Sequence, residues 1–146
     1  MHKGIITILI CIFILASTYG CKDDYNSQVP YVYVDMNFPS SNYIELDIPG
    51  GAIYIKNAGF GGIIIVNNFG DSTNPLLAFD ATCTFEVSST ARVEVKDMGS
   101  GIATCPKCGS QFMIFGSNGS PIKGPAIEPL KQYQALNTNG RIIVRN

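Results

Sequence analysis

Short apolar runs separated by glycine- and proline-containing turns constrain the fold of this chain more than any other feature. The runs are rich in Ile, Val, Tyr and Phe, and turn signals such as Pro49-Gly50-Gly51 and Asn139-Gly140 lie between them. Runs of this kind indicate β-strands, and Asn-Gly between two of them predicts a two-residue hairpin. No window carries a helical apolar stripe over three turns. The sequence therefore predicts an all-β domain.

Ten segments have the composition or the alternation of strands. Residues 31–34 and 53–55 alternate, whereas residues 62–66 are continuously apolar, as expected for a strand covered on both faces. The chain has 146 residues, enough for one domain. An antiparallel β-sandwich or a small barrel is the most economical architecture. The predicted strands are residues 31–36, 43–48, 52–56, 62–67, 76–80, 92–96, 101–104, 111–115, 131–136 and 141–145.

The first 20 residues have the layout of a secretory signal peptide. Lys3 precedes an apolar run over residues 5–16, and a small-residue region leads to Cys21. The apolar run is shorter than the roughly 20 residues that cross a bilayer. The segment resembles a bacterial lipobox, in which the cysteine is lipidated and becomes the mature N-terminus; ordinary cleavage that leaves Cys21 as a free thiol is the alternative. We expect a signal peptide at 1–20, a lipidated N-terminus and linker at 21–30, and a β domain at 31–146.

The residues after Cys21 indicate a location. Lys22-Asp23-Asp24 resembles the export signal that sends some Gram-negative lipoproteins to the outer face of the outer membrane. We therefore expect an outer-membrane lipoprotein at the cell surface, with the periplasmic face as the alternative. Lys+Arg 10 against Asp+Glu 11 leaves no basic face for nucleic acid. The expected partners are the membrane, through the lipid, and an unidentified redox or surface partner.

Loss of the signal peptide limits the chemistry. The single histidine is His2, so the mature chain has no imidazole, which excludes Ser-His-Asp and Cys-His catalysis. No acid/base pair is evident either, and we do not expect a stand-alone enzyme. Of five cysteines, one lies in the signal peptide and Cys21 carries the lipid. The remaining three, Cys83, Cys105 and Cys108, are the candidate site residues.

The segments around these cysteines resemble a known family. They read ATCTFEV at residues 81–87, TCPKCGSQF at residues 104–112 and FGSNGSPIKGPAIEPLKQY at residues 115–133. Over roughly residues 43–146 the chain resembles the Rieske [2Fe–2S] fold, whose two loops, C-x-H and C-P-x-H-G, hold a cluster between them. This resemblance implies a Rieske-like antiparallel β-sandwich with a two-loop cluster-binding subdomain. It also implies a Gly124-Pro125-Ala126 lid over the site.

The chain departs from the family at the ligands. The first residues of the two loops, Cys83 and Cys105, match the positions that supply thiolates to one iron. The two histidine positions carry Phe85 and Cys108. Ser110 matches a serine that hydrogen-bonds a cluster sulfur in the family. The resemblance therefore implies an altered iron–sulfur site on three cysteines.

The altered ligands change the expected redox chemistry. Imidazole ligands raise the potential of Rieske centres to about −150 to +300 mV, against about −400 mV for plant-type ferredoxins. Cys108 adds negative charge in place of an imidazole, so a bound [2Fe–2S] cluster is expected to be a low-potential, pH-independent electron carrier. Phe85 cannot ligate, which leaves Glu86 and Asp80 as candidate fourth donors.

Three other interpretations of the cysteines stay open. A secreted domain favours a disulfide, either Cys105 with Cys108 or Cys83 with one of them. Zinc would need a carboxylate or water as its fourth ligand. In a metal-free domain the thiols would only pack, and the Phe85 ring would fill the space left by the cluster. The alternative function is thus a cluster-less surface binding or structural module.

Overall fold

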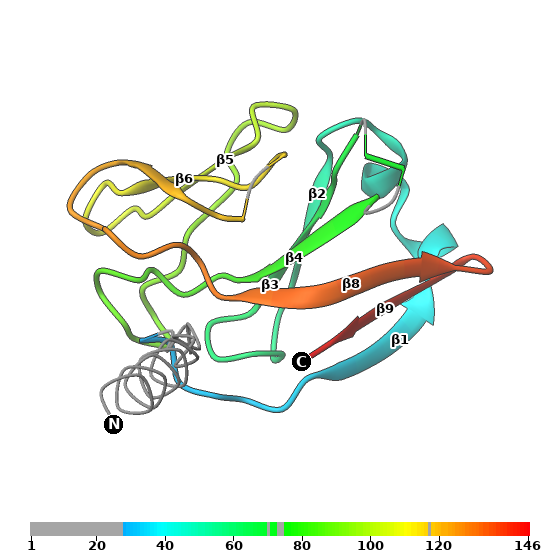
Figure 1. Cartoon of the computed structure of the whole chain (residues 1–146), viewed down its shortest axis with the longest axis horizontal. Helices are drawn as coiled ribbons and strands as arrows, with labels where there is room; N and C mark the ends of the chain where they lie inside the picture. The colour runs from blue at the N-terminus through cyan, green and yellow to red at the C-terminus, as the bar shows by residue number, and fades with distance from the viewer. Residues whose placement is uncertain (1–27, 70, 73–74, 117) are drawn as a thin grey trace, which may run out of the picture.

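The computed structural model describes residues 28–69, 71–72, 75–116 and 118–146. In these residues the regular structure consists of antiparallel strands and two short 3₁₀ helices (Figure 1). One sheet has six strands in the order β1-β9-β8-β4-β3-β2, and a smaller sheet has three in the order β5-β6-β7. The elements are β1 Asp35–Pro39, η2 Ser40–Asn42, η3 Ile44–Asp47, β2 Ala52–Ile55, β3 Ile63–Asn67, β4 Leu76–Asp80, β5 Ile102–Thr104, β6 Gln111–Met113, β7 Pro121–Lys123, β8 Gln132–Thr138 and β9 Arg141–Arg145.

Both faces of the large sheet are covered, so the molecule has two apolar cores. On β3, Ile63 and Ile65 face one core, while Ile64 and Val66 face the other, and all four are buried. The first core includes Leu46 of η3 and Ile142 and Val144 of β9. The second lies between the large and small sheets and contains two of the cysteines, Cys83 and Cys105. The predicted β-sandwich is confirmed.

Several strands lie where the sequence predicts them. The segments predicted at residues 76–80 and 141–145 are β4 and β9, with the same bounds. The predicted hairpin joins β8 to β9, and its turn residues Asn139 and Gly140 both have positive φ, 52° and 70°. Asn and Gly tolerate this left-handed conformation better than other residues. The uninterrupted apolar run of β3 is explained by its two covered faces.

Two predicted strands are wrong. Residues 43–48 form η3 and its flanks instead of a strand, because Tyr43 and Leu46 are three residues apart and both pack on the first core. In a 3₁₀ helix residues three apart share a face, whereas in a strand they would point to opposite faces. Residues 92–96 make only isolated bridges, Thr82 with Arg92 and Glu94 with Thr104. The short strand β7 was not predicted.

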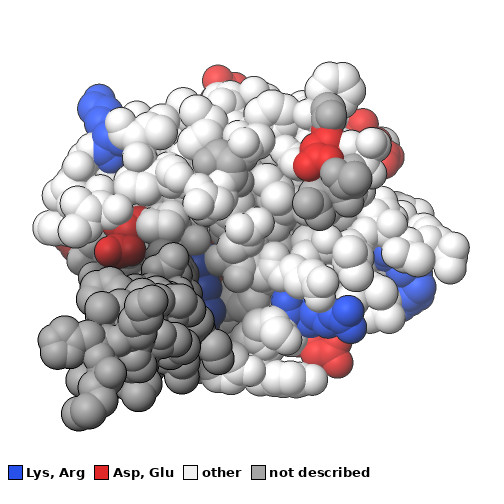
Figure 2. Space-filling model, in the orientation of Figure 1, with Lys and Arg blue, Asp and Glu red and all other residues white. Residues whose placement is uncertain are grey.

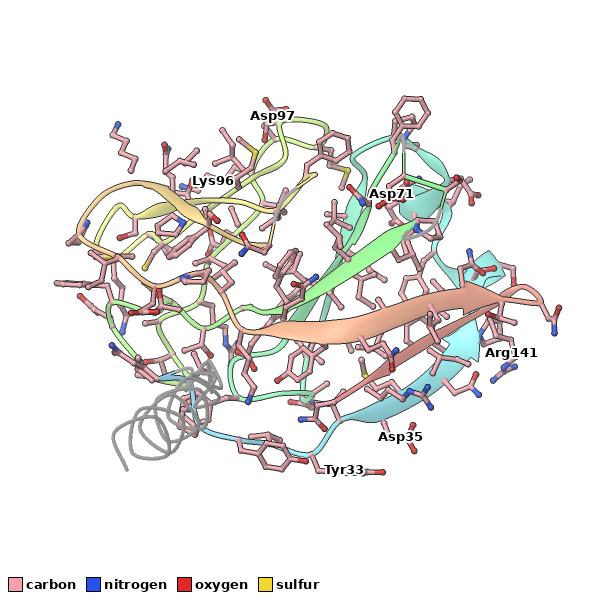
Figure 3. The ribbon with its side chains drawn as sticks, in the orientation of Figure 1. Tyr33, Asp35, Asp71, Lys96, Asp97 and Arg141 are labelled. Atoms are coloured by element: carbon pink, nitrogen blue, oxygen red, sulfur yellow. The ribbon has the colours of Figure 1, made fainter. Side chains whose placement is uncertain are left out.

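The start of the first predicted strand is shifted. Pairing of β1 with β9 begins at Asp35 instead of residue 31, and the preceding Tyr31 and Tyr33 are about 70% exposed, at 72% and 71%. Along this edge the side chains of Tyr33, Asp35 and Arg141 point outward (Figure 3). The Tyr33 hydroxyl donates to Asp35 Oδ2 at 3.4 Å.

The surface carries few charges on the face that Figure 2 shows, where acidic and basic side chains are scattered. Among the described residues, no helix is long and apolar enough to cross a membrane. The predicted signal peptide and Cys21 lie outside the described residues.

Candidate metal centre

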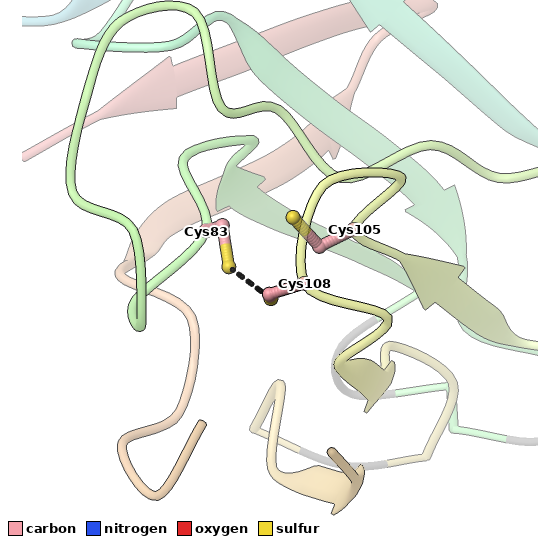
Figure 4. Close-up of side chains that lie close together, drawn as sticks. All are labelled: Cys83, Cys105 and Cys108. Atoms are coloured by element: carbon pink, nitrogen blue, oxygen red, sulfur yellow. Dashed lines mark hydrogen bonds between the residues drawn. The ribbon is translucent and has the colours of Figure 1, made fainter. Parts of the chain in front are cut away.

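Two loops at one end of the sandwich bring the three cysteines together. Cys83 follows β4, while Cys105 and Cys108 lie in the turn between β5 and β6. Their sulfur atoms all lie within 4.8 Å of one another, and the Sγ atoms of Cys83 and Cys108 are 3.5 Å apart (Figure 4). All three are free thiols. Residues separated by more than twenty positions thus meet, as the resemblance implies.

The second loop is held as a tight turn by its own backbone. The Cys105 amide donates to the Ser110 carbonyl at 2.8 Å, and the Gly109 amide donates to the Cys105 carbonyl at 2.9 Å. Gly109 has φ of 73°, a conformation that glycine adopts without steric cost. This closed turn keeps Cys105 and Cys108 on the side that faces Cys83.

The first loop is fixed at both ends of its short cysteine segment. The Cys83 amide donates to the Ala91 carbonyl at 2.8 Å. The Thr84 hydroxyl donates to the Glu128 carbonyl at 2.7 Å, which ties this loop to the segment beyond the lid. Cys83 is fully buried as a result.

Ser110 connects the lid to the second loop. Its buried Oγ accepts from the Ala126 amide and from the Cys108 thiol, each at 3.1 Å. Gly124 lies so close to this loop that a Cβ atom there would be 2.5 Å from Ser110 Cα. A side chain at residue 124 would therefore push the lid away. Both Ser110 and the Gly124-Pro125-Ala126 segment lie at the site, as the resemblance implies.

The two thiols that face each other differ in acidity. Burial raises the pKa of Cys83 to about 12, and the backbone amides of Glu86 and Phe85 oppose this increase only in part. Burial also acts to raise the pKa of Cys108, but hydrogen bonds from Ser110 outweigh it, so this pKa is below its ordinary value. Cys108, which is half-buried, therefore ionises more readily than Cys83.

The candidate fourth donors do not join the thiols. Within the described residues, no carboxylate belongs to the group of donor atoms that the three sulfurs form. Asp80 is fully buried and both its oxygens accept hydrogen bonds from other groups. The expectation that the Phe85 ring fills the site is wrong, since this side chain is 53% exposed.

Sequence reasoning missed the role of Asp80 in positioning the first loop. Its Oδ1 accepts from the amides of Gly61 and Thr82, both at 3.0 Å, and from the Thr82 hydroxyl. Its Oδ2 accepts from the Phe60 amide at 2.7 Å and from the Tyr133 hydroxyl at 2.9 Å. Burial, and then the charge of Asp80, raise the pKa of Tyr133. The available signal was an acidic residue at the end of the apolar run LLAFD.

The spacing of the sulfurs tests which metal group fits. Metal–sulfur bonds of about 2.3 Å place two sulfurs on one tetrahedral metal about 3.8 Å apart. Thiolates on different irons of a [2Fe–2S] cluster lie farther apart, because each iron takes them on its outer side. The family pattern puts Cys83 and Cys108 on different irons, yet these two form the 3.5 Å pair. As they stand, the thiols fit one metal ion and do not fit a two-iron cluster.

Comparison with solved structures places the fold. The chain is similar to the plasma-membrane Rieske protein PetC3 of the cyanobacterium Synechocystis PCC 6803, with 25% identity and a TM-score of 0.57, over 76% of this chain and 99% of that one. It is also similar to a chain from the complex of reduced oxygenase and oxidized ferredoxin in carbazole 1,9a-dioxygenase, with 17% identity and a TM-score of 0.51, over 80% of this chain and 94% of that one. No family model and no curated protein matches the sequence.

Proposed function

We propose, from the premise that this chain is a Rieske-like domain, that it transfers electrons through a metal centre bound by Cys83, Cys105 and Cys108. The observation that carries the proposal is the convergence of three thiols from two loops within 4.8 Å. Buried thiols that only pack do not need to converge, whereas thiolates gathered at one point are ligands that iron and zinc prefer.

The surrounding groups suit thiolate ligands. Once Cys108 is deprotonated, the Ser110 hydroxyl that lies 3.1 Å away can donate to its sulfur. The backbone amides of Phe85 and Glu86 favour the thiolate form of Cys83. Such donors stabilise negative charge on sulfur and tune the potential of the bound metal. A bound redox metal would supply one-electron chemistry, and these residues would hold it.

The proposal includes a low potential. The described site contains no imidazole, and each thiolate adds negative charge that favours the oxidised metal. In the family, the imidazole ligands also make the potential depend on pH. Without them, this source of pH dependence is absent.

The proposal also places the domain on a membrane. Cys21 and the following Lys22-Asp23-Asp24 support a lipid anchor at the outer face of the outer membrane. Val29 is already buried in the domain, with 2% of its surface exposed. Eight residue steps join Cys21 to Val29, and a fully extended chain of that length spans at most about 30 Å. The domain would therefore stay close to the bilayer, within reach of a membrane-bound redox partner.

A second candidate function is a metal-free surface module with a disulfide. The 3.5 Å separation of Cys83 and Cys108 supports it, because a small movement would bring these thiols into bonding range. Oxidising conditions outside the cytoplasm favour such a bond. In this case one thiol would remain.

Purification of the mature protein, which on this proposal begins at the lipidated Cys21, in detergent without oxygen tests both candidates. Electron transfer predicts bound iron and visible absorption that bleaches on reduction. A colourless protein with a Cys83–Cys108 disulfide and one free thiol would support the second candidate. Thiol counts before and after denaturation distinguish a disulfide from thiols protected by metal.

A further inference from the structure

We propose that the three thiols bind a single four-coordinate metal ion with an exchangeable fourth ligand, instead of a cluster of two irons. This inference rests on the proposed function, because it requires that metal binds at Cys83, Cys105 and Cys108. It goes beyond that function by assigning the number of metal ions, the absence of inorganic sulfide and an open coordination position.

The geometry of the sulfur triangle is the first argument. The side from Cys83 to Cys108 is 3.5 Å and no side exceeds 4.8 Å. One tetrahedral metal with sulfur bonds of about 2.3 Å has sulfur–sulfur edges of about 3.8 Å, which lies inside this range. Small adjustments of the side chains therefore suffice to place one ion between the three sulfurs.

The anchoring of the loops is the second argument. Room for two irons requires Cys83 to move away from Cys108. The Cys83 amide is bound to Ala91, and Thr84 is bound to Glu128 at 2.7 Å. On the other side, Ser110 is bound to the lid through the Ala126 amide. Opening the site by a shift of the loop backbones would break or stretch these hydrogen bonds, whereas a single ion leaves them in place.

The protein leaves the fourth coordination position of the metal to an outside ligand. No carboxylate or imidazole joins the three sulfurs in the described part of the chain. The Ser110 hydroxyl is already used by the Ala126 amide and by Cys108. Cys108 is half-buried and Phe85 is 53% exposed, so solvent reaches this side of the site. Three protein ligands plus water is the pattern of metal sites that exchange their fourth ligand.

The ligand charge narrows the class of metal. Three thiolates in a tetrahedral arrangement favour Zn²⁺ or iron. With three negative charges, Fe³⁺ gives a neutral site and Fe²⁺ or Zn²⁺ gives a site of charge −1, before the fourth ligand is counted. A water molecule or a small thiol would complete either one. Iron would allow electron transfer, whereas zinc would not.

The test is metal analysis of the mature protein, purified in detergent without oxygen, followed by replacement of the native metal with Co²⁺. We expect one metal ion per chain, no acid-labile sulfide, and the visible bands of tetrahedral Co²⁺ with strong thiolate charge-transfer absorption. Each of Cys83→Ser, Cys105→Ser and Cys108→Ser is expected to remove about a third of that absorption, because the absorption scales with the number of thiolate ligands. Addition of a small thiol is expected to shift the Co²⁺ spectrum without displacing the metal.

A conservative control lies beside the site. Thr104→Ser changes the residue next to Cys105 without removing a ligand and should leave the Co²⁺ spectrum unchanged. If a cysteine variant does not fold, the metal and sulfide counts of the unchanged chain still decide the matter. Two irons with two sulfides per chain would overturn the single-ion inference and leave electron transfer standing. A single zinc ion would support the inference and contradict electron transfer. Absence of bound metal would overturn both.

Discussion

Asp80, at the end of β4, and the thiol site, whose first residue Cys83 follows three positions later, differ in how fully hydrogen bonds satisfy their polar atoms. At Asp80, both carboxylate oxygens are saturated by hydrogen bonds from Phe60, Gly61, Thr82 and Tyr133. At the thiols, each sulfur lies near other sulfurs, and Ser110 is the hydroxyl in contact with Cys108. The first site needs nothing further, whereas the second has donor atoms that a metal could use.

This difference in hydrogen bonding indicates that the two sites have different roles. Asp80 binds the amide and the hydroxyl of Thr82, so it fixes the backbone directly before Cys83. The thiols are positioned by that backbone and by the second loop, but they make few strong interactions of their own. We therefore expect changes at Asp80 to cost folding stability, and changes at the thiols to cost metal binding instead. Each expected loss of stability refers to the free energy of unfolding of the metal-free protein.

The largest loss of stability is expected for Asp80→Ala. This change leaves buried amides and the Tyr133 hydroxyl without an acceptor, and each unsatisfied buried donor costs about 1–3 kcal/mol. The free energy of unfolding should fall by at least about 3 kcal/mol, measured by urea denaturation. Asp97→Ala, at an exposed position, is the matched control and should change it by less than about 0.5 kcal/mol. Equal losses in the two variants would show that the Asp80 network is not structural.

A smaller loss is expected for Tyr133→Phe. The hydroxyl donates to the buried Asp80 carboxylate, and hydrogen bonds to charged groups contribute about 1.5–3 kcal/mol. Tyr54→Phe removes a hydroxyl that donates to the neutral Gly61 carbonyl at 2.8 Å, so its cost should be about 0.5–1.5 kcal/mol. Urea denaturation of the two variants gives the difference. If Tyr54→Phe costs more, the charge of Asp80 is not what strengthens the Tyr133 bond.

The loss should be smaller still for Cys108→Ala. The side chain is half-buried and its removal leaves no charge without a partner, so the free energy of unfolding should fall by less than about 1 kcal/mol. Metal affinity, measured by competition with a chelator, should fall strongly in the same variant. A loss of stability as large as that of Tyr133→Phe, with metal affinity unchanged, would reverse the roles assigned to the two sites.

Alkylation distinguishes the thiols without a substitution. In the metal-free protein, iodoacetamide should modify Cys108 first, because this thiol is half-exposed and its pKa is lowered by Ser110. Cys83 is fully buried and its pKa is raised to about 12, so it stays protonated at neutral pH and should react only after unfolding. Mass spectrometry of the modified peptides gives the order. Equal rates in the native protein would mean that the site is more open than the structure describes.

Much of the fold could be predicted from the sequence, because turns and strand composition are local signals. The hairpin turn at Asn139-Gly140 has positive φ at both residues, which Asn and Gly tolerate. The continuous apolar run at residues 62–66 indicates a strand that is covered on both faces. The segment at residues 43–48 misled because Ile44, Leu46 and Ile48 alternate with acidic residues as in a strand, although only Leu46 of the three is buried. Local pattern cannot choose between a strand and a 3₁₀ turn without the neighbouring strands.

The site was predicted only in part, because its geometry depends on contacts between segments that are far apart in the chain. The resemblance of the two loops implied that Cys83 would meet Cys105 and Cys108, and their sulfurs do lie together. It did not give the distances, so the mismatch with two irons became visible only in three dimensions. The sequence suggested Asp80 as a possible metal ligand. Its structural role could not be predicted, because hydrogen-bond donors such as Tyr133 come from segments far away in the chain.

X-ray absorption at the edge of the native metal tests the central claim most directly. If the two loops hold one ion between Cys83, Cys105 and Cys108, the spectrum should show three sulfur neighbours at about 2.3 Å, one lighter neighbour, and no second metal. A short metal–metal distance, or fewer than three sulfur neighbours from the protein, would contradict the account.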